Sequence, residues 1–87
     1  MKTSSIISKF SKVGITFSTT PILTSVAYVA ESKNMMIGFT SRDGKASSVA
    51  TWAKGADLQS HSFTGKDYHK SIRDVVQWVL RQDSRAA

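Results

Sequence analysis

The fold of this chain is decided by the stretch Phe63–Gln82, FTGKDYHKSIRDVVQWVLRQ. Its apolar residues recur at the spacing of one helical face, at Tyr68, Ile72, Val75, Val76 and Val79. Charged and amide side chains take the opposite side of the same helix. The pattern therefore predicts an amphipathic helix over about residues 65–82, followed by a fraying tail over residues 84–87.

The start of this helix carries capping signals. Thr64 is a good N-cap, and Asp67 is placed to return a hydrogen bond to it. Phe63 and Tyr68 have the spacing of a hydrophobic staple. Trp78 falls beside the apolar stripe, so we assign it to the core margin or to a subunit contact.

The chain has 87 residues, enough for one small domain spanning residues 1–87. Such a domain buries a modest core, and a sheet with one helix leaves surface to cover, so we expect a homo-oligomer. The sequence contains no cysteine, which excludes disulfides and thiolate metal sites.

The N-terminal third is ambiguous. Ser5–Phe10 and Val13–Ser18 have the alternation of two short strands, which favours a hairpin. Because Ser11-Lys12 lacks good turn chemistry, a single helix over Ser4–Lys12 is the competing interpretation. Thr19-Thr20-Pro21 is predicted to be a break, since proline cannot donate to a ladder.

The middle of the chain reads as strands separated by turns. The strongest turn signal is Arg42-Asp43-Gly44-Lys45, because Asp-Gly tolerates positive φ. The predicted strands are Ser25–Glu31, Met35–Ser41, Ala46–Lys54 and Leu58–Phe63, with turns at 32–34 and 55–57. We therefore expect an α+β fold, with a curved antiparallel sheet of four to six short strands followed by one C-terminal amphipathic helix.

The net charge of +6, from twelve Lys and Arg against six Asp and Glu, favours a polyanionic partner. The apolar runs are too short for a membrane span, and we expect no membrane association. Residues 1–30 resemble an organelle transit peptide in their lysines and hydroxyls, but strand-like alternation and the lack of arginine argue against it. We expect a cytoplasmic or nucleoid-associated protein.

No catalytic constellation is recognisable, and we predict neither an enzyme nor a cofactor or metal site. His61 and His69 are isolated, and their spacing is not a metal-ligand pattern. Thr64-Gly65-Lys66 at a helix start could hold a phosphate, but we favour the simpler interpretation of a helix cap beside a lysine.

Basic residues and aromatic rings alternate along the strand region. If Val49 points into the core, Trp52 points outward, which makes it the best candidate for stacking on a nucleic-acid base. A core or dimer-interface position is the alternative for Trp52. The predicted nucleic-acid-binding residues are Lys9, Lys12, Lys33, Arg42, Lys45, Trp52 and Lys54.

Several strands, a basic turn and a capped C-terminal helix together resemble the Whirly and transcriptional-coactivator type of single-stranded-DNA-binding protein, including small phage transcription proteins. The resemblance lies in strand order over most of the chain, and the lysine-rich strand signature of Whirly proteins is missing. It implies a homo-oligomer that binds single strands along its sheet.

The leading hypothesis is thus a non-enzymatic basic domain that binds nucleic acid, with single-stranded DNA favoured over duplex. The alternative is a small protein-interaction module, such as a phage-encoded inhibitor of a host factor. A structural subunit of an organelle complex is the third possibility.

Overall fold

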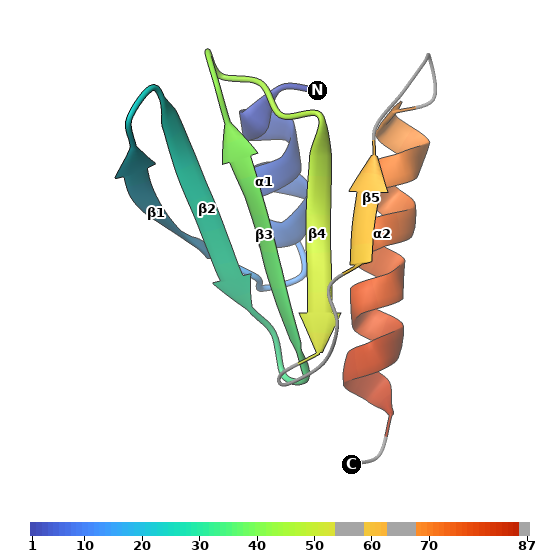
Figure 1. The fold of residues 1–87 in the computed structure, drawn as a ribbon. Coiled ribbons are helices and arrows are strands. Elements are labelled where there is room, and N and C mark those ends of the chain that lie inside the picture. The colour runs from blue at the N-terminus through green and yellow to red at the C-terminus, as the bar shows by residue number, and fades with distance from the viewer. Residues whose placement is uncertain (54–58, 63–67, 86–87) are drawn as a thin grey trace.

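The computed structural model describes residues 1–53, 59–62 and 68–85. Within them the chain forms a helix, five strands and a second helix (Figure 1). The elements are α1 (Thr3–Ser11), β1 (Phe17–Ile22), β2 (Ser25–Glu31), β3 (Met35–Ser41), β4 (Ser48–Ala53), β5 (Gln59–Ser62) and α2 (Tyr68–Ser84). The predicted plan of an antiparallel sheet followed by a C-terminal helix is confirmed.

The strands form one antiparallel sheet in chain order, β1-β2-β3-β4-β5. β2 and β3 have the predicted bounds, and Tyr28 pairs with Phe39 between them. The β3–β4 turn closes with hydrogen bonds between Arg42 and Lys45 in both directions. Asp43 and Gly44 take φ values of +54° and +73°, so the predicted Asp-Gly turn is confirmed.

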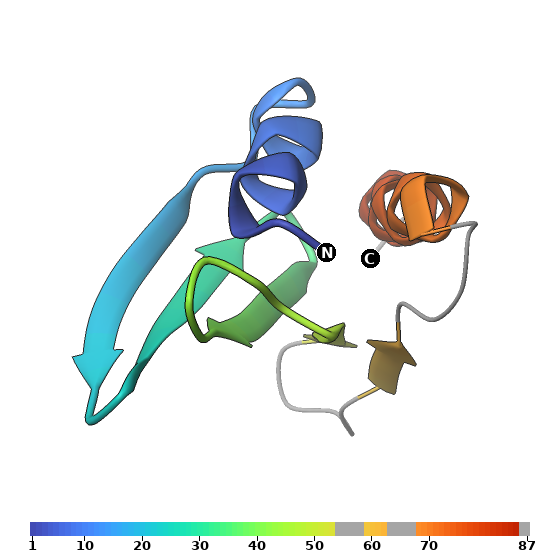
Figure 2. The ribbon, with the colours of Figure 1, turned by 90° about the horizontal axis from the view of Figure 1, so that it is seen from above.

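Both helices cover the same face of the sheet and leave the other face open (Figure 2). The core lies between the sheet and the helices and is formed by buried side chains of α1, the strands and α2. Its fully buried apolar side chains include Ile6, Phe10, Ile37, Val49, Ile72 and Val79. An aromatic cluster extends this core, since Phe17 makes edge contacts with Phe10 and Phe39, and Tyr28 stacks on Phe39.

The predicted hairpin of Ser5–Phe10 and Val13–Ser18 is wrong, and the competing helix is observed. Thr3, Ile6 and Phe10 are all buried, at the three- and four-residue spacing of one helical face. Gly14 ends the helix with a φ of +82°. The N–H of Gly14 bonds to Ser11 O and the N–H of Ile15 to Phe10 O, the two bonds of a Schellman motif.

The predicted break at Thr19-Thr20-Pro21 is also wrong, because all three residues belong to β1. Pro21 pairs with Val26 of β2, and β1 is an edge strand. An edge strand tolerates proline because only one of its sides needs donors for the sheet.

The C-terminal end of α2 is held by the β2–β3 turn. The Asp83 carboxylate accepts hydrogen bonds from Ser32 Oγ and from the Asn34 N–H, each at 2.8 Å. Asn34 Nδ2 donates to the backbone carbonyl of Gln82 at 2.9 Å. The turn thus satisfies carbonyl and carboxylate groups that the end of a helix would leave without partners.

Ile72, Val75, Val76 and Val79 of α2 are buried, as their spacing predicts. The predicted capping residues Thr64 and Asp67, with Phe63 and the turn at 55–57, lie outside the described residues.

Candidate nucleic-acid interface

Trp52 lies on the open face of the sheet. Along β4, Val49 and Thr51 are buried on the helix-covered side, and Trp52 takes the opposite side, across from Met36 of β3. This placement of Trp52 was predicted from the position of Val49. Alternation along a strand is the cause, since neighbouring side chains point to opposite faces.

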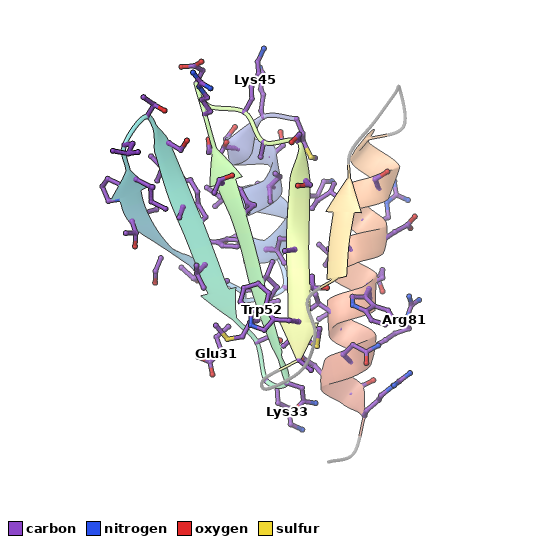
Figure 3. All side chains as sticks on the ribbon, viewed as in Figure 1. Glu31, Lys33, Lys45, Trp52 and Arg81 are labelled. Atoms are coloured by element: carbon purple, nitrogen blue, oxygen red, sulfur yellow. The ribbon has the colours of Figure 1, made fainter. Side chains whose placement is uncertain are left out.

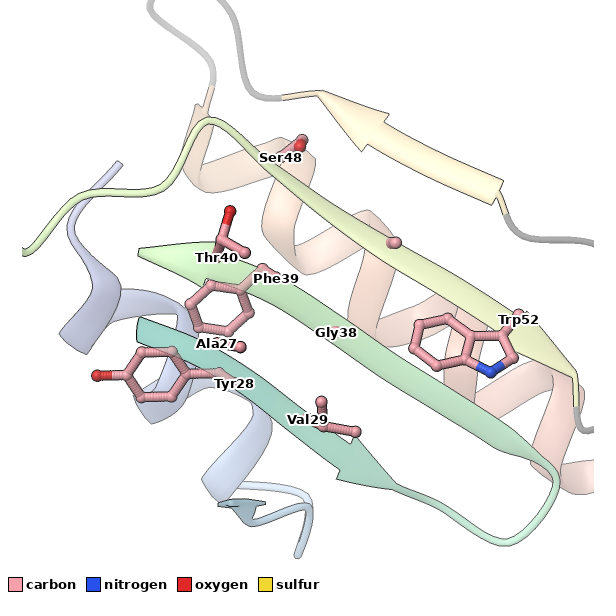
Figure 4. Close-up of a pocket in the computed structure, with 9 residues that line it drawn as sticks. Ala27, Tyr28, Val29, Gly38, Phe39, Thr40, Ser48 and Trp52 are labelled. Atoms are coloured by element: carbon pink, nitrogen blue, oxygen red, sulfur yellow. The ribbon is translucent and has the colours of Figure 1, made fainter. Parts of the chain in front are cut away.

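The indole of Trp52 rests on Gly38, which lies on β3. A Cβ added to Gly38 would lie 3.1 Å from Trp52 Cη2 and 3.3 Å from Cζ3, closer than ordinary contact. Only glycine therefore leaves room for the ring at this height above the sheet. In the close-up the indole is seen face-on over the strands, so one ring face is turned to the sheet and the other away from it (Figure 4).

Small side chains border the ring and create a shallow hollow of about 350 Å³ on the open face (Figure 4). Its floor crosses three strands, with Ala27 from β2, Gly38 from β3 and Ala50 from β4. Val29, Thr40, Ser48 and Trp52 also line it, and Val29 is 41% exposed. Tyr28 and Phe39 complete the lining, which is mainly apolar. The hydroxyl groups of Thr40 and Ser48 lie at the end away from Trp52 (Figure 4).

The strand register places no lysine or arginine on the open face of β1 to β4. The charged residue that it does place there is Glu31, next to Met36 in the register of β2 and β3. The predicted cations lie instead at the two ends of the sheet. Lys33 is exposed in the β2–β3 turn, and Arg42 and Lys45 are exposed in the β3–β4 turn at the opposite end (Figure 3).

Lys9 and Lys12 do not join this set. Lys9 lies in α1 and Lys12 at its C-terminal end, and α1 covers the other face of the sheet. There they border a separate polar hollow with Ser4, Ser5 and Ser8. Their predicted position on the sheet followed from the incorrect hairpin. Lys54 lies outside the described residues.

Two residues of this region were not predicted from the sequence. Lys2 forms an isolated backbone bridge with Lys45, and the N–H of Thr3 bonds to Gly44 O at 2.9 Å, so Lys2 adds a cation to the Arg42 and Lys45 end. Gly38 was not recognised as the support of Trp52. Both depend on residues distant in the sequence, and no local pattern indicates them.

The part of the chain that the structure describes offers few other groups from which a functional site could be built. No cluster of three metal-ligating side chains occurs there, and neither described helix is long and apolar enough to cross a membrane. Trp78 is half-buried, and its indole Nε1 has no hydrogen-bond partner among the described residues. Its place at the margin of the core agrees with its position beside the apolar stripe of α2.

No family model, characterised protein or solved structure matches the chain. The resemblance to Whirly-type proteins stays a prediction.

Proposed function

We propose that this protein binds single-stranded nucleic acid, with single-stranded DNA as the first candidate, on the open face of its sheet. The observation that supports this most is the Trp52 ring, which lies on Gly38 with one face turned outward. A ring held in this way is preorganised for stacking, because the sheet fixes its orientation before a ligand arrives. Stacking of one base on such a ring contributes about 1–3 kcal/mol.

The small residues beside Trp52 make room for a base to approach. Ala27, Gly38 and Ala50 leave a hollow where larger side chains would stand above the sheet. Thr40 and Ser48 supply hydroxyl groups that can donate to or accept from the edge of a base. This arrangement suits a flat, weakly polar group and is tolerant of base identity.

The phosphates would be neutralised at the ends of the sheet. Lys33 precedes β3, and Arg42 and Lys45 follow it, so a nucleic-acid strand running along β3 meets cations at both ends. The seven residues of β3 span about 23 Å, at roughly 3.3 Å per residue. Several nucleotides fit over that length, in keeping with the site sizes of other sheet-based single-strand binders.

The test is fluorescence anisotropy of labelled single-stranded DNA, duplex DNA and RNA. Replacing Trp52 with alanine is expected to weaken single-strand binding by about five- to 150-fold, the equivalent of 1–3 kcal/mol. Trp78→Phe is the control, since Trp78 lies on α2 and not on the open face. Equal binding by the wild type and Trp52→Ala would remove Trp52 from the site.

A matched pair of charge variants separates a local site from general attraction. Lys33→Ala/Lys45→Ala and Lys9→Ala/Lys12→Ala each remove two positive charges, the first pair at the two ends of the sheet and the second on α1 or at its C-terminal end. The first double variant is expected to reduce the slope of log K against log salt by about 1.4, at roughly 0.7 per phosphate contact. The second should change the slope much less. Equal effects would mean that binding reflects only net charge.

A second candidate function is a protein-interaction module. The observation that favours it is the absence of lysine and arginine from the described open face, which is apolar apart from hydroxyl groups and Glu31. The variant Glu31→Gln distinguishes the two candidates. It removes a negative charge near the proposed path of the phosphates, so it should tighten nucleic-acid binding. A partner complex that withstands high salt, without binding of free nucleic acid, would select the protein-interaction function.

A further inference from the structure

The tip of the β1–β2 hairpin carries the most exposed large apolar residue of the described chain. Leu23 has a relative exposure of 104%, and the neighbouring Ile22 is 46% exposed. Ile22 pairs with Ser25, so Leu23 and Thr24 form a two-residue turn. The φ of Leu23 is +48°, in the left-handed region that bulky residues rarely adopt. Leucine is therefore unfavourable here for both its backbone and its side chain.

The β3–β4 hairpin has the residues that a turn with positive φ values usually contains. Between β3 and β4 the positive φ values fall on Asp43 and Gly44, which tolerate them at little cost. Glycine or asparagine at position 23 would ease the first turn in the same way. Leu23 makes no contribution to the core that would explain it, since its side chain is fully exposed.

The end of the sheet that carries the tip is also rich in positive charge. Val26 pairs with Ser41, which brings the β1–β2 turn to the same end of the sheet as Arg42 and Lys45 (Figure 1). Lys2 is bridged to Lys45, and the α-amino group of Met1 donates to Ala46 O at 3.0 Å, so both lie at this end. The exposed Leu23 thus lies at the end of the sheet that also carries Arg42, Lys45 and Lys2, with Asp43 as an acidic residue there. The N-terminus is at the same end but apart from the β1–β2 turn (Figure 2).

We infer that Leu23 is a wedge that inserts between bases where a single strand meets a duplex. Apolar side chains on protein projections insert between base steps in this way, while nearby cations hold the flanking phosphates. This inference rests on the proposed function: the single strand would lie along the open face, and the duplex end would abut the Leu23 tip. It adds a substrate class, a forked or gapped nucleic acid, to simple single-strand binding.

A lipid surface fits the tip less well. Stable attachment to a membrane needs more apolar surface than one acyl chain provides, and Leu23 with half of Ile22 offers less than that. A wedge between bases needs a single side chain, which is what the tip presents. The positive charge at this end of the sheet complements phosphate in either case, so the experiment includes both ligands.

The test compares Leu23→Asn with the wild type on a labelled single strand and on a fork that carries the same strand as its arm. Asparagine tolerates the left-handed conformation, so the variant should unfold at the same temperature or higher. The wild type is expected to bind the fork about tenfold more tightly than the single strand, a difference of roughly 1.4 kcal/mol. In Leu23→Asn that preference should disappear, while single-strand affinity is unchanged. Val13→Asn, which alters another exposed aliphatic residue, should keep the preference.

Fluorescence of a 2-aminopurine placed at the fork junction reports unstacking directly. It should rise when the wild type binds and stay low with Leu23→Asn. Equal binding of fork and single strand by the wild type, or an unchanged fork preference in Leu23→Asn, would overturn the wedge and leave the proposed function intact. Capture by phosphatidylserine vesicles that depends on Leu23, without binding of any nucleic acid, would overturn both.

Discussion

Substituting Gly38 with alanine should displace the Trp52 ring while leaving the stability of the fold nearly unchanged. The added Cβ would lie 3.1 Å from Trp52 Cη2 and 3.3 Å from Cζ3. Comfortable carbon contacts lie at about 3.5–4.0 Å, so the ring must retreat by roughly 0.4–0.9 Å. Because Trp52 is on the open face, its ring can move outward without displacing other elements. We therefore expect a shifted indole in an otherwise intact protein.

The free energy of unfolding should change little in this variant. Alanine in a strand is favoured over glycine by about 0.5–1 kcal/mol, because glycine loses more conformational freedom on folding. That gain offsets the contacts that the displaced indole loses to the sheet. The expected net change is within about 1 kcal/mol of zero, while base stacking on the displaced ring is weakened.

Urea unfolding followed by circular dichroism measures the stability, and emission in a Trp78→Phe background reports on Trp52 alone. We predict a red-shifted Trp52 emission at nearly unchanged stability. Gly44→Ala is the matched control, since its φ of +73° strains alanine while the site has open space. That control should lose about 1–2 kcal/mol without changing the emission. A loss above about 3 kcal/mol in Gly38→Ala, or an emission identical to that of the parent, would refute the described contact.

Three further outcomes follow from the fold. Asp83→Ala removes the acceptor for two hydrogen bonds from the β2–β3 turn and should lower the free energy of unfolding by about 1–3 kcal/mol in urea titrations. Ile6→Ala should lower the free energy of unfolding by about 2–5 kcal/mol, and Ile7→Ala, on the half-exposed side of α1, should lower it clearly less. Equal losses of stability in the two variants would contradict the packing of α1. Pro21→Val restores a backbone N–H donor to the edge strand β1 and should promote self-association, which light scattering measures. A variant as monodisperse as its parent would show that Pro21 does not protect this edge.

The central hairpin could be predicted because its local signals agree. β2 and β3 have strand composition, and Asp43-Gly44 supplies the positive φ values that the next turn requires. The N-terminal helix could not be settled in the same way. Ile6 and Phe10 are four residues apart, a spacing that places them on one face of either a strand or a helix. In the structure the helix is supported by the burial of Thr3 and by the C-cap at Gly14 and Ile15. The spacing of apolar residues in the sequence indicates neither of these contacts.

In the candidate site, too, the features that follow from local sequence patterns could be predicted and those that depend on distant residues could not. The side of the sheet that Trp52 occupies follows from alternation with Val49, and this was predictable. Gly38 beneath it depends on the register of β3 against β4, which no local pattern specifies. Lys9 and Lys12 were misplaced because an error in the secondary structure of their segment moved them to the wrong layer.

The most direct test of the account is an NMR titration of the ¹⁵N-labelled protein with a single-stranded DNA oligonucleotide. We predict that the indole N–H signal of Trp52 and the amide signals of Gly38 and Ala50 shift together, while those of Trp78 and α1 stay in place. Shifts concentrated on Lys9 and Lys12 in a titration that leaves Trp52 unmoved would contradict binding on the open face.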